Sequence, residues 1–106
     1  MSSQLNHIIL LCDDEKNGPE ACHLIGSVDP FLQVHLVYNL DELLRALKTF
    51  IPKLIIVYVV GKDDIFSRYV KRLRKEMHLD SIPIYVYSVL PTREEIRNLM
   101  DQVLKE

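Results

Sequence analysis

Four short apolar segments alternate with four amphipathic ones along this chain, and that alternation constrains the fold more than any other feature of the sequence. The apolar segments are bounded by turn residues or charges, which is typical of strands. They are residues 8–12, 31–37, 54–60 and 82–88. The third carries no charge and predicts a central strand, whereas the second, with Gln33 and His35, predicts a strand at a sheet edge. Strands that alternate with helices predict an α/β fold with a parallel sheet, helices on both faces and right-handed crossovers.

The amphipathic segments carry apolar residues at helical spacing. These stripes cover residues 21–28, 40–47, 65–77 and 96–104. Two of the predicted helices begin with a capping box, in which a cap oxygen and a Glu three residues later satisfy backbone N–H groups at the helix start. Asn39 with Glu42, and Thr92 with Glu95, fit this pattern.

Size, charge and cysteine content exclude several classes of protein. A chain of 106 residues suits a single domain, residues 1–106. The formal net charge of −2 argues against nucleic-acid binding, which normally requires a basic surface. The longest apolar run is far too short to cross a bilayer, and no signal peptide is visible, so we expect a cytoplasmic protein without a membrane partner. Cys12 and Cys22 are too few for a disulfide framework and predict buried thiols.

The candidate site lies where the strands end, because ligands of open α/β sheets bind outside the carboxyl ends of the strands. The first strand ends at Asp13 and Asp14, the third near Tyr58 and the fourth at Ser88. An acidic pair beside a hydroxyl suits Mg²⁺, which takes one or two carboxylates and several waters. Two interpretations stay open: Asp13 and Asp14 bind Mg²⁺ weakly, or they bond loop amides as short acidic residues do. The Ser88 hydroxyl either donates to an incoming oxyanion or bonds the backbone.

Histidines offer no further site by spacing alone. They are scattered along the chain, and we expect no metal site among them. Their positions are His7, His23, His35 and His78.

Three segments in order resemble the receiver domain of bacterial response regulators. Residues 9–15 resemble its first strand and acidic pair, residues 52–57 its third strand, and residues 82–88 its fourth strand with a terminal hydroxyl. The resemblance covers roughly residues 7 to 104. It implies a flavodoxin-like three-layer sandwich with four or five strands in the order 2-1-3-4. It also implies an acidic pocket of Asp13 and Asp14, a switch hydroxyl at Ser88 and a role in two-component phosphorelay signalling.

Two departures from that family bear on function. The position of the phosphate-accepting aspartate holds Tyr58. A phenol has a reference pKa of ~10 and is a poor nucleophile at neutral pH. A slipped alignment with Asp63 or Asp64 as acceptor would place Gly61 inside the strand. The family's lysine at the end of a fifth strand has no counterpart, because Leu90 precedes the only later proline.

We therefore expect an atypical receiver that is not an enzyme and that signals through protein–protein contacts without Asp phosphorylation. Its partner would be a sensor kinase or an output protein. One alternative is a Mg²⁺-dependent receiver that accepts phosphate on Asp13 or Asp14. Another is a structural subunit whose sheet is completed by a partner chain, which includes a homodimer.

The last helix and the fourth strand leave further alternatives. The helix either packs beside the first helix or leaves an apolar face that drives dimerisation. Tyr85 and Tyr87 either form a docking surface or pack under a helix. The basic residues of the third helix form a solvated face or attract an acidic partner. They are Arg68, Lys71, Arg72, Arg74 and Lys75.

Overall fold

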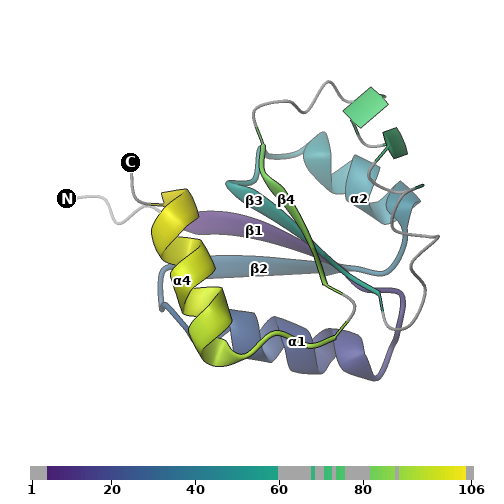
Figure 1. The fold of residues 1–106 in the computed structure, drawn as a ribbon. Helices are drawn as coiled ribbons and strands as arrows, with labels where there is room; N and C mark the ends of the chain where they lie inside the picture. Colours follow the sequence, from purple (N-terminus) through teal and green to yellow (C-terminus); the bar gives the residue numbers. More distant parts are fainter. Residues whose placement is uncertain are drawn as a thin grey trace.

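The protein is built on one sheet of four parallel strands in the order β2-β1-β3-β4. A computed structural model describes residues 5–59, 68, 71–72, 74–75, 82–87 and 89–104 (Figure 1). The strands are β1 Asn6–Leu11, β2 Leu32–Val37, β3 Leu54–Tyr58 and β4 Ile84–Tyr87. The helices with described bounds are α1 Asn17–Gly26, α2 Leu40–Leu47 and α4 Arg93–Leu104. The predicted α/β fold, its parallel sheet and its strand order are confirmed.

Burial separates the central strands from the edge strands. Every residue of β3 is buried, and β1 is buried from Ile8 to its end. A strand that is apolar on both sides requires cover on both faces of the sheet, and the helices supply it. At the edge, β2 has an exposed side chain at Gln33 and partly exposed ones on both faces. The predicted positions of the second and third strands in the sheet are therefore confirmed.

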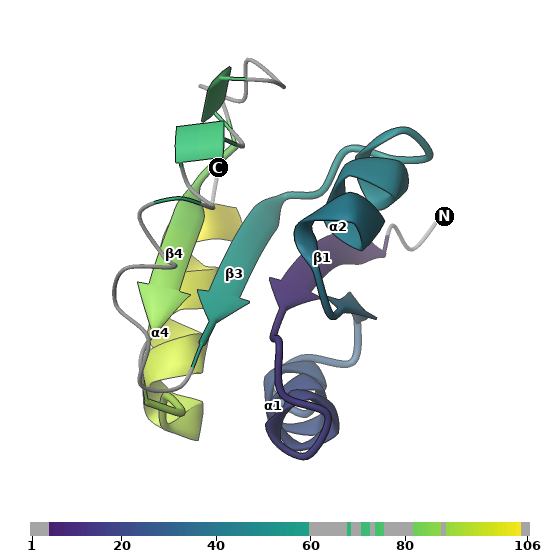
Figure 2. The ribbon, with the colours of Figure 1, turned by 90° about the vertical axis from the view of Figure 1, so that its right-hand side faces the viewer.

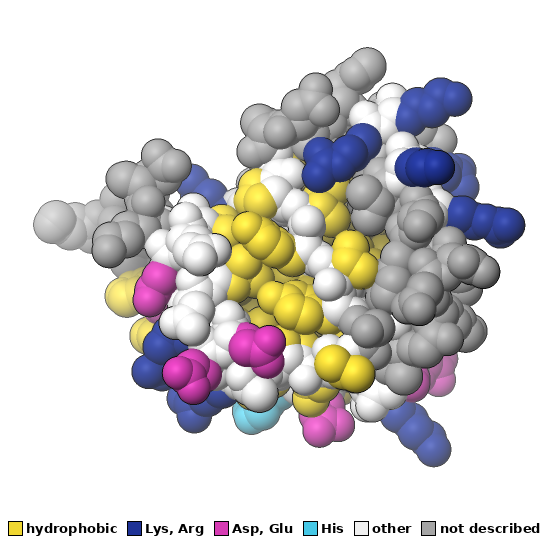
Figure 3. Space-filling view, in the orientation of Figure 1, with side chains coloured by type: hydrophobic (Ala, Val, Ile, Leu, Met, Phe, Trp, Pro, Cys, Tyr) yellow, Lys and Arg dark blue, Asp and Glu magenta, His cyan; other side chains and the backbone are white. Residues whose placement is uncertain are grey.

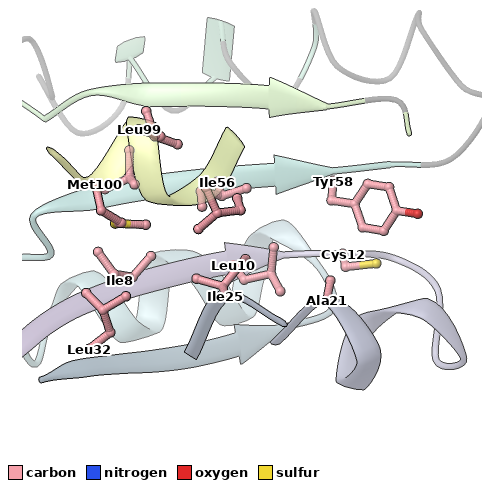
Figure 4. Close-up of a cluster of buried hydrophobic side chains, with 12 residues drawn as sticks. Ile8, Leu10, Cys12, Ala21, Ile25, Leu32, Ile56, Tyr58, Leu99 and Met100 are labelled. Carbon is pink, nitrogen blue, oxygen red and sulfur yellow. The ribbon is translucent and has the colours of Figure 1, made fainter. Parts of the chain in front are cut away.

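Two hydrophobic cores lie on opposite faces of the sheet, because successive side chains of a strand alternate between its faces. Ile8, Leu10 and Ile56 face α1 and α4. Ile9 and Leu11, one step along the chain, belong to the core under α2. Figure 4 shows the first of these cores, in which side chains from β1, β3 and α4 point toward one another.

The last helix packs beside the first, as one of the two interpretations predicted. α4 contacts α1 (Figure 1), and Figure 2 shows α4 behind β3 and β4. The Arg93 side chain also donates from Nη2 to the Ser27 carbonyl at 3.1 Å. Ile96, Leu99 and Met100 of α4 are buried in the core that α1 shares. The face that would otherwise drive dimerisation is therefore largely covered by the chain itself.

Both predicted helix caps are present, and the second forms a complete capping box. The Glu42 N–H donates to Asn39 Oδ1 at 2.9 Å, while Glu42 Oε1 accepts from the Tyr38 N–H rather than from the cap residue itself. At α4 the exchange is reciprocal: the Glu95 N–H donates to Thr92 Oγ1 at 3.1 Å, and the Thr92 N–H donates to Glu95 Oε1 at 2.9 Å. These bonds satisfy donors that a helix start leaves without an intrahelical partner.

Some predictions fall on residues outside the described part, namely Ser88, Asp63, Asp64 and most of the predicted third helix. The five basic residues predicted on that helix are described, and they are helical and exposed. Across the described residues, no helix combines the length and the apolar character that crossing a bilayer requires.

Candidate functional site

The candidate site lies at the carboxyl ends of β1 and β3. These strands are neighbours, and Leu11 pairs with Val57. That register places Cys12, which follows β1, beside Tyr58 at the end of β3, and both belong to one buried cluster. Asp13 and Asp14 follow directly on the chain. The structure thus brings three of the four predicted site residues to one edge of the sheet, and the fourth, Ser88, lies outside the described residues.

Asp14 holds the loop that leads into α1. Its Oδ1 accepts the Lys16 N–H at 2.8 Å and the Asn17 N–H at 3.4 Å, and its Oδ2 accepts the Asn17 side-chain amide at 2.6 Å. Its carbonyl oxygen accepts the Gly18 N–H at 2.8 Å. The Lys16 N–H, followed by the two groups of Asn17, holds the pKa of the Asp14 carboxyl below its usual value. Asp14 therefore matches the interpretation of a carboxylate that bonds loop amides.

Tyr58, which the receiver resemblance predicts at the acceptor position, is packed at the end of β3. Its side chain is only 5% exposed and lies among the core residues near Cys12 and Ala21. Figure 4 shows the ring beyond the end of β3, with the hydroxyl directed away from the centre of the core. Burial, and then the nearby Cys12, Glu20 and Asp14, raise the pKa of the phenol above its usual value. The phenol is therefore protonated at neutral pH and is neither a nucleophile nor a metal ligand.

Cys12 and Cys22 are free thiols. Cys12 is buried, and its Sγ lies 3.7 Å from the Asp14 carbonyl oxygen. Burial is the main cause that raises the pKa of each thiol. Nucleophilic cysteines need a lowered pKa, so the chemistry here matches unreactive thiols, buried at Cys12 and half-buried at Cys22.

The acidic edge fits a Mg²⁺ ion poorly. Among the described residues, no group of three or more His, Cys, Asp or Glu side chains gathers where it could hold a metal. Both oxygens of Asp14 already accept N–H groups, and Asp13 also has an interaction partner. A hard cation here would have to share the Asp14 oxygens with those N–H groups. We derive no chemistry through a metal at this edge.

A cluster that sequence reasoning missed lies toward the opposite end of the sheet. His7 Nδ1 and His35 Nε2 are 3.0 Å apart. The Phe50 ring packs against both imidazoles, with centroid distances of 5.1 Å to His7 and 4.3 Å to His35. The sequence held only part of the signal. His7 lies two residues before Ile9, so the two side chains are expected on the same face of β1. The pairing of Ile9 with His35 then places both imidazoles on one face.

The edge at β4 is the third feature with functional potential. In the described part of the chain, β4 pairs with β3 alone. The Pro83 and Tyr87 carbonyls accept the Ile55 and Val59 N–H groups at 3.0 and 3.2 Å. Because backbone groups alternate in direction along a strand, those of Ile84 and Val86 point away from the sheet.

This β4 edge is apolar. Val86 and Val89 are 39% and 72% exposed, and residues 82–90 carry no charge. Figure 3 shows hydrophobic side chains gathered in the middle of this side of the molecule, over β4 and beside α4. Tyr85 and Tyr87 are only partly exposed and pack against the core that α1 and α4 cover. For these tyrosines the structure favours packing under a helix.

A scan against protein-family models and searches among curated proteins and solved structures found no match to this chain. The resemblance to receiver domains therefore stays a prediction, carried by the motifs, and the fold is established by the structure itself.

Proposed function

We propose that this chain is an atypical receiver of a cytoplasmic two-component or phosphorelay system. It acts as a binding module for a sensor kinase or an output protein, without phosphorylation of an aspartate. The observation that carries this proposal is the burial of Tyr58 at the end of β3. The parallel sheet in the order β2-β1-β3-β4 supports it as well, because the receiver resemblance implies that order.

The chemistry of the carboxyl-end edge supports a function without phosphoryl transfer. Transfer to a carboxylate requires a free attacking oxygen and a cation that neutralises the incoming phosphoryl group. Tyr58 offers a protonated phenol, and the oxygens of Asp14 are bound to N–H groups at the start of α1. Because the Tyr58 phenol and the Asp14 oxygens have structural roles, we infer that a receiver of this kind acts by binding a protein partner.

The first test is an amide-proton NMR titration with Mg²⁺ and then with beryllofluoride, which mimics an acyl phosphate. We expect no saturable shifts at Asp13, Asp14 or Tyr58. Asp14→Asn serves as the matched variant, since any specific response should disappear with the carboxylate. Saturable Mg²⁺-dependent shifts at these residues in the wild-type chain would instead favour the receiver that accepts phosphate on Asp13 or Asp14.

A second candidate function is favoured by the β4 edge: a structural subunit whose sheet continues into a second copy of this chain. An uncharged strand with outward backbone groups is self-complementary, and two copies can pair antiparallel across a two-fold axis. Charged residues, which commonly protect natural edges, are absent from residues 82–90.

Sedimentation velocity separates this candidate from the first. A homodimer that dissociates on Val86→Lys, but not on Gln33→Lys at the opposite edge, would support the structural subunit. Gln33 is a matched control because it is an exposed residue of the other edge strand, β2. A clean monomer at high concentration would leave the binding module as the function to pursue.

A further inference from the structure

Two imidazoles meet on one face of the sheet, at its β2 edge. His7 lies near the start of β1, and His35 lies on β2, paired with Ile9 two residues further along β1. The two side chains therefore meet diagonally across neighbouring strands, and both are half-buried. Their facing nitrogens, His7 Nδ1 and His35 Nε2, are 3.0 Å apart.

We propose that His7 and His35 form a two-imidazole site for a borderline divalent transition-metal ion, with Ni²⁺ and Cu²⁺ as its best ligands. Imidazole nitrogen suits the late first-row metals. The site stands apart from the carboxyl-end edge and does not rest on the proposed signalling function.

The separation of the two nitrogens fits coordination of one ion. A metal bound to both at ~2.0–2.1 Å would see them at an angle of roughly 95°. That angle is close to the cis angle of square-planar or tetragonal coordination, which is typical of Cu²⁺ and Ni²⁺, and smaller than the tetrahedral angle of Zn²⁺. The hydrogen bond aims each nitrogen at the other, so each ring must turn by roughly 40° to aim at an ion beside them.

Protonation states also favour coordination. An N–H···N bond between two imidazoles requires that one of the two nitrogens carries a lone pair. A neutral imidazole can move its single proton to the nitrogen that faces away, so both facing nitrogens become available to a metal without a net loss of protons.

Phe50 supplies the support that such a pair needs. Its ring packs within 4.3 Å of the His35 ring and 5.1 Å of the His7 ring, measured between centroids. Both imidazoles therefore pack against one aromatic ring. The half-exposed position leaves water to fill the remaining coordination positions.

Isothermal titration with NiCl₂ and with CuCl₂ tests the proposal. We expect the wild-type chain to bind one ion, and His7→Gln or His35→Gln to weaken binding by ~100-fold, because a second ligand on the same frame acts as an intramolecular partner. His23→Gln is the matched control and should leave the affinity unchanged, since His23 is exposed on α1.

Paramagnetic broadening by Cu²⁺ on the wild-type chain gives a second readout, which does not depend on the folding of any variant. The signals of His7, His35 and Phe50 should broaden first. Absence of saturable binding at millimolar metal would overturn the proposal. Binding that survives both His7→Gln and His35→Gln, or broadening centred on His23, would do the same.

Discussion

Replacement of Tyr58 by aspartate tests whether Tyr58 is only a structural core residue or instead fills a pocket that could still accept phosphate. The side chain is 5% exposed and lies in the core under α1 and α4. A buried Tyr removes ~150–250 Å² from water. At ~25 cal/mol per Å² this burial is worth at most about 4–6 kcal/mol, since an unfolded chain already hides part of its surface.

Tyr58→Asp therefore lowers the free energy of unfolding by about 3–5 kcal/mol, as other large-to-small core changes do. The new carboxylate would be desolvated beside apolar neighbours, which adds to the loss unless it takes up a proton. Total stability of a domain is ~5–15 kcal/mol, so this variant should lie close to the limit of folding.

Urea unfolding followed by circular dichroism measures the change, with Tyr58→Phe as the matched control. The control keeps the ring and removes only the hydroxyl, so we expect it to cost less than about 1.5 kcal/mol. The reasoning is refuted if Tyr58→Asp keeps wild-type stability within about 1 kcal/mol and gains Mg²⁺-dependent beryllofluoride binding. That outcome would mean that Tyr58 fills a pocket which otherwise still accepts phosphate.

Three further predictions follow from local contacts. Thr92→Ala should lower the free energy of unfolding by ~1 kcal/mol because the Glu95 N–H loses its cap, and an unchanged urea midpoint would contradict this. Gly26→Ala should raise it by ~0.5–1 kcal/mol, because a Cβ there meets only Val34 Cγ2 at 3.8 Å; a lower midpoint would show a clash. Burial lowers the folded pKa of His35 from its usual 6.5, so the folded state binds fewer protons. Its contribution to stability should be complete above pH 6.5 and be lost as the pH falls through the lowered pKa. Urea midpoints measured across pH 5 to 8 should show this slope, and His35→Gln should reduce it.

Patterns that depend on neighbouring residues alone could be predicted from the sequence. The alternation of strands and helices, both helix caps and the central position of residues 54–58 all follow from local periodicity and side-chain chemistry. The position of α4 beside α1 was one of two interpretations, and buried Ile96 decides it in favour of packing on the α1 face.

Features that depend on the register between strands could not be predicted. His7 and His35 are 28 positions apart, and only the pairing of Ile9 with His35 brings them together. The role of Asp14 was open for the same kind of reason. The choice between a metal ligand and a loop anchor depends on whether backbone N–H groups reach the carboxylate, and here those of Lys16 and Asn17 do.

The path of α4 connects the fold to both candidate functions. A helix after β4 that lay on the α2 face would leave the α1 face half covered, and the apolar surface there would need a partner. Because α4 instead packs on the α1 face, the chain itself covers that apolar surface. Within the part of the chain that the structure describes, the edge of β4 keeps apolar surface accessible at Val86, together with outward backbone groups. A partner that adds a strand there gains affinity from main-chain hydrogen bonds, whereas side-chain contacts give specificity. A receiver without a phosphorylation switch would therefore be expected to use this edge constitutively, and Val86→Lys should weaken such binding regardless of phosphate donors.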